Sequence, residues 1–278
     1  NFFTLAATSQ EQTPRLETKD RFVPVIGRNG MVTSREKIAS QVGVDILKKG
    51  GNAVDAAVAV GFAMAVTYPQ AGNLGGGGFM VIHLAKENKS IAIDYREMAP
   101  AAASRDMFLN ADGTVNEMSS RFTHKATGVP GTVAGMAHAL KNYGTMSLQE
   151  VMRPAYDLAL AGFPMYNYLE GSLNARKERM MQNDAAAKVF YKKDGSSYKY
   201  GETFKQKDLA WSLKRIMEGG QKEFYHGEIA ERIVADMEAN GGLITMGDMA
   251  NYKAVERPAL VGEYKGHKVV TMPPPSSG

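Results

Sequence analysis

The feature that most constrains this chain is a run of four consecutive glycines at positions 75–78. A backbone without Cβ atoms can adopt positive φ and can lie directly against another backbone. Two short apolar segments follow, 79–84 and 91–95, separated by a polar stretch with the composition of a turn. The pattern predicts a β-hairpin that places Arg96 at the end of a strand, where binding residues are often found.

A glycine run also suggests a phosphate-binding loop, but the neighbouring residues do not fit one. A P-loop needs Gly-Lys-Ser/Thr at the start of a helix, and a dinucleotide fingerprint needs Gly-x-Gly-x-x-Gly between a strand and a helix. Here the glycines precede a predicted strand, no lysine follows them, and Met80 takes the place of the last fingerprint glycine. On these residues alone, a tight connection that binds nothing remains an alternative.

Six short segments, taken together, carry a resemblance to a known family. They read GGNAVDAA at 50–57, PQAGNLGGGGF at 69–79, DYREMAP at 94–100, GVPGTVAG at 128–135, NGGLIT at 240–245 and PPPSSG at 273–278. In this order they resemble the signature of the γ-glutamyltranspeptidases, N-terminal-nucleophile hydrolases that act on glutathione and related γ-glutamyl amides. Only the first 25 or so residues lie outside the resemblance.

Composition limits the classes of function. A chain of 278 residues, 44% hydrophobic and 22% charged, can bury a large core in one or two domains. The net charge of +4 is spread along the chain, and the basic runs are no longer than pairs, so no nucleic-acid partner is predicted. The absence of cysteine excludes disulfides, thiol nucleophiles and zinc–thiolate sites.

Helix signals fill the middle of the chain and strand signals lie at its ends. Capping-box pairs at Asn52/Asp55 and Ser147/Glu150 predict two helix starts. Residues 53–66 have Asp55 as their one polar side chain, so this helix should be buried, and Gly61 suits close packing against a sheet. It is too short to cross a bilayer, so no membrane span is predicted. The remaining predictions are a strand at 31–34 ending at an N-cap Ser34, helices at 38–49, 131–142, 147–160, 168–182, 206–217, 228–240 and from 245, and a final hairpin at 260–264 and 267–271.

This order of elements indicates an α+β protein. The resemblance implies the four-layer αββα sandwich of the N-terminal-nucleophile hydrolases, completed by a second, small subunit. Residues 26–278 would then be the large-subunit portion of one domain, and residues 1–25 a flexible N-terminal lead-in. The family's bacterial members are typically exported, so the resemblance implies a periplasmic or secreted protein, with the first residues as a possible trimmed end of a signal sequence.

No catalytic residue is predicted in this chain. The family's nucleophile is a threonine activated by its own α-amino group, which is freed when the precursor cuts itself and the threonine becomes the first residue of the small subunit. No threonine begins this chain, so the resemblance implies a large subunit that acts only as an obligate heterodimer with the small one. Thr123 and His124 are not expected to form a nucleophile–base pair. The histidines show no metal-ligand spacing, there is no Gly-x-Ser-x-Gly elbow, and no metal or organic cofactor is implied.

Arg96 is the predicted substrate-binding residue. Its planar guanidinium matches a carboxylate and stays charged at any working pH. The residues alone leave open an ion pair with Asp94 or Glu97, whereas the resemblance implies that Arg96 holds the α-carboxylate of the γ-glutamyl group. The implied activity is that of a γ-glutamyltransferase or glutathione hydrolase, transferring the γ-glutamyl group to water, amino acids or peptides. The alternatives are a cephalosporin acylase, a poly-γ-glutamate depolymerase, or a catalytically inactive carboxylate-binding homologue.

Overall fold

The computed structural model describes residues 25–277, which fall into two units divided between Met31 and Val32. The first unit contributes only residues 25–31, and the second contains every helix and strand described. The predicted lead-in at 1–25 lies, apart from Val25, outside the described residues and stays a prediction. The extent of the domain at 26–278 stays a prediction as well.

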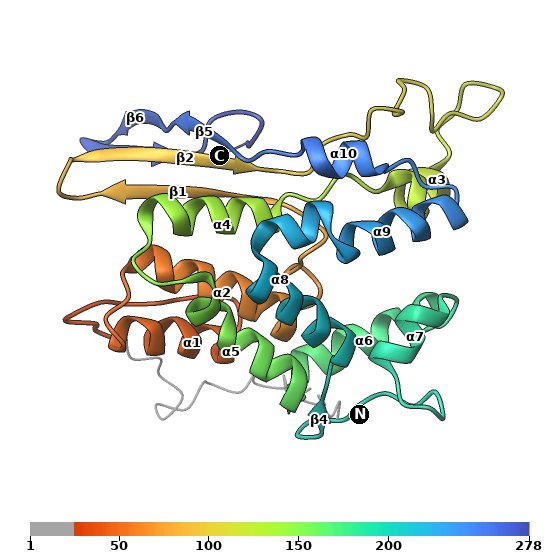
Figure 1. Ribbon diagram of the computed structural model, residues 1–278, viewed down its shortest axis with the longest axis horizontal. Coiled ribbons are helices and arrows are strands. Elements are labelled where there is room, and N and C mark those ends of the chain that lie inside the picture. The colour runs from red at the N-terminus through yellow and green to blue at the C-terminus, as the bar shows by residue number, and fades with distance from the viewer. Residues whose placement is uncertain (1–24, 278) are drawn as a thin grey trace, which may run out of the picture. The chain divides into compact units, whose positions relative to one another are not determined.

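A three-stranded antiparallel sheet contains the predicted hairpin (Figure 1). β1 (Gly78–Leu84) pairs with β2 (Lys89–Tyr95), which confirms the hairpin, and β2 pairs on its other side with β5 (Val255–Pro258). Met80 lies opposite Ile93, and Ile82 lies opposite Ile91. Because directly opposite residues share one face of a sheet, these four side chains form the face that packs on the core.

The opposite face of this sheet is only partly covered in the described part of the chain. Phe79 lies opposite Asp94 on this face, and Val81 lies opposite Ala92. Val81 is 41% exposed and Val255, on β5, is 44% exposed. Within the described residues, the helical layer therefore packs on one face of this three-stranded sheet.

α2 (Ala53–Thr67) lies at the centre of the helical layer and is buried as predicted. It packs mainly on α1 (Lys37–Lys48), α4 (Thr132–Tyr143) and α5 (Leu148–Ala161), and α4 is the helix that packs on β1 and β2 (Figure 1). The expectation that Gly61 packs against the sheet was therefore wrong. A Cβ at Gly61 would be 2.4 Å from the Cε of Met136, so the space is filled by α4.

The predicted capping boxes are confirmed, and the first of them does more than cap α2. Asn52 Oδ1 accepts from the Val54 and Asp55 amides, while Asp55 Oδ2 accepts from the Asn52 amide at 2.7 Å. The buried Asp55 carboxylate also accepts from the Thr145 and Met146 amides, at 2.8 and 3.0 Å, and from the Thr145 hydroxyl. Burial alone would raise the pKa of Asp55, but these hydrogen bonds hold it below its ordinary value.

The strand predicted at 31–34 is absent, and the N-cap of α1 is Glu36 rather than Ser34. The Ser34 hydroxyl donates to the Glu36 carbonyl at 2.8 Å and lies 2.7 Å from the Ser40 hydroxyl. The Glu36 carboxylate, which is buried, accepts from the Ala39 amide at 3.0 Å. The capping position therefore moves two residues along the chain, to a longer side chain that reaches back to the helix.

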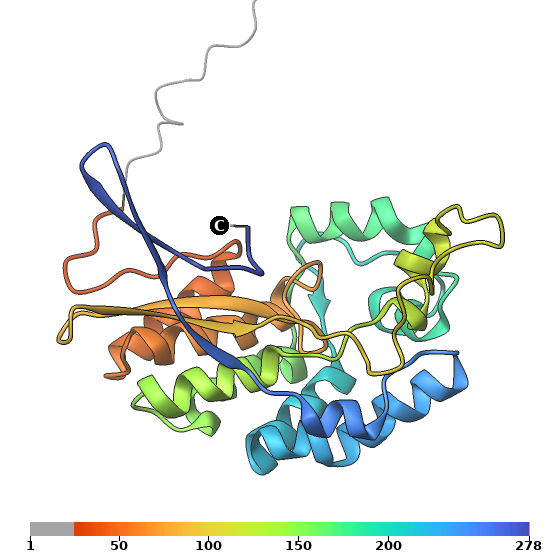
Figure 2. The ribbon, with the colours of Figure 1, turned by 90° about the horizontal axis from the view of Figure 1, so that it is seen from above.

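Most of the other predicted elements are confirmed within a few residues. α8 (Lys207–His226) runs past the predicted end at 217, because the chain continues through a kink at Gly220, where φ is +66°. The final hairpin consists of β6 (Leu260–Tyr264) and β7 (His267–Thr271), which pair with each other and form a separate two-stranded sheet (Figure 2). The remaining elements are α3 (Glu117–Phe122), the 3₁₀ turn η2 (His124–Ala126), β3 (Phe163–Pro164), α6 (Asn167–Met180), α7 (Asp184–Phe190), β4 (Thr203–Phe204), α9 (Glu228–Ala239) and α10 (Met246–Asn251).

Among residues 25–277, none of the helices combines the length and the apolar character needed to cross a bilayer.

Candidate functional site

Arg96 follows β2 directly and is exposed, with the glycine run against its main chain. A Cβ on Gly77 would lie 2.5 Å from the Tyr95 carbonyl oxygen and 2.7 Å from the Glu97 amide nitrogen. Both are backbone atoms, so no side-chain movement could relieve the contact. The glycine run is therefore needed at this point for close approach to the residues on either side of Arg96.

A second glycine segment, at the start of α4, approaches the same strand end. A Cβ on Gly131 would lie 2.0 Å from the Tyr95 carbonyl oxygen and 2.1 Å from the Tyr252 hydroxyl. A Cβ on Gly135, one turn later, would lie 2.1 Å from the ring of Tyr95. The segments at 75–78 and 128–135 thus pack around one short stretch of backbone.

The glycine run is also tied to α4 by hydrogen bonds. The Gly76 carbonyl accepts from the Gly131 and Thr132 amides, at 2.7 and 3.0 Å. Asn73 Oδ1 accepts from the Gly76 amide at 2.7 Å and from the Thr132 hydroxyl at 2.8 Å. Two donors at the N-terminus of α4, which could otherwise bind an anion, are therefore used within the protein. This agrees with the rejection of a phosphate-binding loop.

The main chain of Arg96 is held on both sides. Its amide donates to Asp94 Oδ1 at 3.2 Å, and its carbonyl accepts from the Tyr252 hydroxyl at 2.8 Å. Asp94, which is 8% exposed, is paired with Arg257: Nε and Nη2 both lie 2.9 Å from Asp94 Oδ2. Asp94 is therefore neutralised by Arg257.

The guanidinium of Arg96 has no carboxylate partner within residues 25–277. Its Nη1 donates to the Pro275 carbonyl at 3.3 Å, which leaves other donors of the fork available. The alternative of an ion pair with Asp94 or Glu97 is thus not what the structure contains. An exposed guanidinium that has no carboxylate partner in the described part of the chain can bind an anionic ligand.

Two hollows meet at Arg96. One, of about 340 Å³, lies on the side of Gly77, Phe79 and Ser277. The other, of about 450 Å³, lies on the side of Tyr252 and Lys253. Both are lined by Arg96, Glu97 and Pro275. A ligand that reaches Arg96 can therefore extend in either direction.

The tyrosines behind Arg96 stay protonated at neutral pH. Burial raises the pKa of Tyr95 to about 12. Burial, together with the nearby Asp94 and Glu97 carboxylates, also raises the pKa of Tyr252. Both hydroxyls act as hydrogen-bond donors, Tyr95 to the Phe79 carbonyl at 3.3 Å and Tyr252 to that of Arg96.

Other candidate groups form no reactive set in the described part of the chain. The Thr123 hydroxyl donates to the Ser119 carbonyl, while His124 Nε2 lies 2.9 Å from Asp236 Oδ2, so Thr123 and His124 are not paired with each other. His138 Nε2 lies 2.8 Å from Glu256 Oε1. No group of three or more His, Cys, Asp or Glu side chains among residues 25–277 could hold a metal ion.

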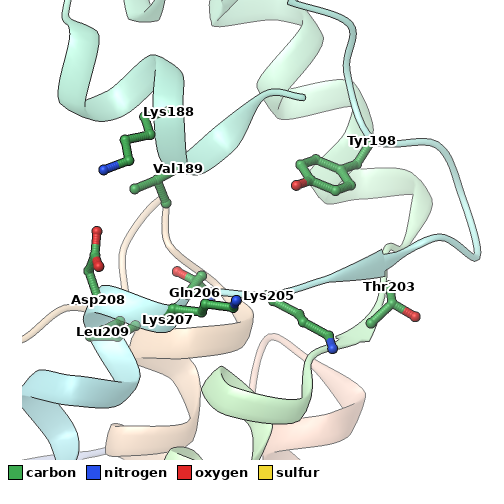
Figure 3. Close-up of a pocket in the computed structure, with 9 residues that line it drawn as sticks. All are labelled: Lys188, Val189, Tyr198, Thr203, Lys205, Gln206, Lys207, Asp208 and Leu209. Atoms are coloured by element: carbon green, nitrogen blue, oxygen red, sulfur yellow. The ribbon is translucent and has the colours of Figure 1, made fainter. Parts of the chain in front are cut away.

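A separate hollow of about 600 Å³ lies between α7, β4 and the start of α8 (Figure 3). Lysines 188, 205 and 207 line it, but their amino groups point in different directions, and Asp208 adds an opposite charge. These side chains do not converge on a single point. The hollow at Arg96 is therefore the better candidate.

Sequence reasoning identified Arg96 and the glycine run but missed the residues that hold them. Tyr252 and Arg257 lie 156 and 163 residues from their partners Arg96 and Asp94. No local pattern marks either residue. The glycines of the 128–135 segment were a usable signal, because two glycines four residues apart on a helix indicate a close neighbour on that face.

This chain is similar to known proteins over most of its length. The family model described as gamma-glutamyltranspeptidase matches residues 39–278. The glutathione hydrolase proenzyme of Escherichia coli K12 is 53% identical over 260 residues, which are 94% of this chain and 45% of the relative. The chain thus spans less than half the length of that relative.

Solved structures of gamma-glutamyltranspeptidases are also similar to this chain. The gamma-glutamyltranspeptidase of Helicobacter pylori superposes with a TM-score of 0.89 at 45% identity, over 91% of this chain and 73% of the other. That of Pseudomonas nitroreducens, in complex with L-DON, superposes with a TM-score of 0.84 at 40% identity, over the same shares of each chain. The expected α+β fold of the N-terminal-nucleophile hydrolase type is confirmed.

Proposed function

This chain belongs to the γ-glutamyltranspeptidase family, and from that premise we propose that it is the large-subunit portion of a two-chain γ-glutamyltransferase and glutathione hydrolase. The second chain, from the same precursor, carries an N-terminal threonine as nucleophile. The threonine hydroxyl attacks the γ-carbonyl carbon of the donor, and the C–N bond to the leaving amine breaks with transfer of a proton to that amine. Water or an acceptor amine then attacks the γ-glutamyl ester, which frees the threonine.

Arg96 binds the α-carboxylate of the γ-glutamyl group in this proposal. The observation that carries it is the exposed guanidinium without a carboxylate partner among residues 25–277, at the meeting point of two hollows. Asp94 does not compete for this guanidinium, because Arg257 already neutralises it. A carboxylate held here fixes one end of the donor, which limits the region in which the γ-carbonyl can lie.

The proposed cellular location and subunit composition follow from the family. The family's bacterial members are typically exported, which supports a periplasmic or secreted location. The relatives' names describe proenzymes, which supports a heterodimer formed by self-cleavage of one precursor. Two glutathione hydrolase proenzymes are 53% and 46% identical to this chain, so the cephalosporin acylase and poly-γ-glutamate depolymerase alternatives have less support.

Arg96→Lys in the full two-chain enzyme tests the proposal. Lysine keeps the charge but cannot form two parallel bonds to one carboxylate. A charge-assisted hydrogen bond contributes about 1.5–3 kcal/mol, so KM for γ-glutamyl-p-nitroanilide should rise at least about tenfold. Arg153→Lys is the matched control, because Arg153 is exposed on α5 and pairs with Asp157. An unchanged KM in Arg96→Lys would remove Arg96 from the site.

Two further measurements separate the alternatives. Faster turnover of glutaryl-cephalosporin than of the γ-glutamyl substrate would indicate an acylase. A precursor that stays uncut on a denaturing gel would indicate the inactive homologue.

A further inference from the structure

We infer that Tyr252 is a positioning residue for the γ-glutamyl site: its hydroxyl fixes the main chain of Arg96 and so directs the guanidinium toward the substrate's carboxylate. This inference rests on the proposed function, because it takes Arg96 as the carboxylate ligand. Tyr252 itself is not required to contact the reacting atoms.

The hydroxyl of Tyr252 is held in a fixed place. Tyr252 is 8% exposed, and its oxygen lies 2.8 Å from the Arg96 carbonyl oxygen. Its ring stacks on that of Tyr225, with centroids 5.6 Å apart and planes 6° from parallel. The Tyr225 hydroxyl in turn donates to the Pro130 carbonyl at 2.8 Å. The stack joins α8 to the residue that follows α10 and keeps the Tyr252 ring from turning away from Arg96.

Residues before and after Tyr252 in the sequence also anchor the backbone near Arg96. Arg257 binds the Asp94 carboxylate, and Asp94 Oδ1 accepts a hydrogen bond from the amide of Arg96. Asp248, at the start of α10, accepts the Ala101 amide at 2.8 Å. The chain from α10 to β5 therefore contacts the 94–101 stretch at three residues, which are Asp94, Arg96 and Ala101.

These anchors act on the backbone of Arg96 and leave its side chain free to bind. The guanidinium has one hydrogen bond to the protein in the described residues, to the Pro275 carbonyl at 3.3 Å. The backbone sets the position and direction from which this flexible side chain starts, so a shift of the backbone moves the whole range that the guanidinium can reach. Paired bonds from a planar fork to a carboxylate depend strongly on that direction. Loss of the Tyr252 hydroxyl should therefore weaken carboxylate binding selectively.

Tyr252→Phe in the full two-chain enzyme tests this role, because it removes the hydroxyl and keeps the stack on Tyr225. The readout is the inhibition constant of L-glutamate as a competitive inhibitor, compared with that of its α-carboxamide, which lacks the carboxylate. The constant for L-glutamate should rise about fivefold, the worth of one hydrogen bond. The constant for the α-carboxamide should change by less than about twofold, because Arg96 gains little from it.

A double-mutant comparison shows whether Tyr252 acts through Arg96. In the Arg96→Lys background, adding Tyr252→Phe should change the L-glutamate constant by less than about twofold, since the paired bonds are already lost. Tyr191→Phe is the matched control: Tyr191 is buried, and its hydroxyl donates to the Leu173 carbonyl at 2.8 Å, away from Arg96. It should leave both constants unchanged.

The two proposals fail in different ways. An equal rise for both inhibitors, or an equal effect of Tyr252→Phe with and without Arg96→Lys, overturns the positioning role and leaves the proposed function standing. An L-glutamate constant that Arg96→Lys does not change overturns the role of Arg96 itself. If Tyr252→Phe fails to fold or mature, Arg257→Gln tests the same assembly from the amide side of Arg96, and it must show the same selective loss for L-glutamate.

Discussion

Gly131→Ala would test whether close packing around the end of β2 controls the site. The added Cβ would stand 2.0 Å from the Tyr95 carbonyl oxygen and 2.1 Å from the Tyr252 hydroxyl, whereas Cβ atoms rarely come within 3.0 Å of another heavy atom. The φ of Gly131 is −113°, which alanine adopts without strain, so the effect is one of space alone. The backbone must therefore move by about 1 Å at the peptide bond that joins Tyr95 to Arg96.

Two measurable losses follow from that shift. Overpacking costs about 1–3 kcal/mol, and the upper end applies because the obstructing atom belongs to the backbone. A displacement of about 1 Å in a binding group can lower kcat/KM by about 100-fold, so we expect a loss of ten- to 100-fold on γ-glutamyl-p-nitroanilide. Urea unfolding and initial-rate kinetics of the mature two-chain enzyme measure the two effects.

The control is Gly171→Ala, the same substitution in the middle of α6, where a Cβ would meet nothing within 4 Å. Alanine there should raise the free energy of unfolding by about 0.5–1 kcal/mol and leave kcat/KM unchanged. If Gly131→Ala matched the wild type in both stability and kcat/KM, the close approach to Tyr95 would not constrain the site, and the reasoning would be refuted.

The remaining predictions concern Asp55 and pH. Asp55→Asn should lower the free energy of unfolding by about 2–4 kcal/mol in urea titrations, because the new amide would turn an NH₂ group toward donors that now meet a carboxylate; a loss below about 0.5 kcal/mol would contradict this. The pKa of Asp55 lies below its ordinary value of 3.8, so its contribution is present above about pH 4 and is lost as the pH falls through the folded-state pKa. Wild-type stability should therefore fall more steeply below pH 4 than that of Asp55→Asn, and parallel curves would show that Asp55 is not the group responsible.

Local signals predicted much of this fold. The capping boxes at Asn52 and Ser147 need only a side chain and an amide three residues away, and both are confirmed. The hairpin of β1 and β2 needs only a polar turn between two apolar segments.

The elements that were missed or mispredicted depend on partners distant in sequence or on backbone conformations that the local residues do not reveal. β5 (Val255–Pro258) was not predicted, because its four residues show no alternation and end in proline, and its pairing partner lies more than 160 residues away. α8 was predicted too short, because Gly219 and Gly220 are typical of a helix end, yet the chain resumes a helical path after one residue at positive φ.

For the candidate site, the sequence singled out Arg96, whose role in binding stays a prediction, but not the residues that support it. Arg96 stands in a recognisable motif, and the resemblance suggested its role. Tyr252 and Arg257 hold it through contacts that only the tertiary fold creates.

The close approach of residues 77 and 131 to the backbone around Arg96 also bears on protein engineering. Random libraries at these two positions would yield mostly unfolded or immature variants, since every replacement adds at least one carbon where the structure has no room. Phe79 lines one of the two hollows at Arg96, and Met98 and Lys253 line the other. Libraries that seek a changed ligand preference at this candidate site should therefore draw their diversity from these three positions.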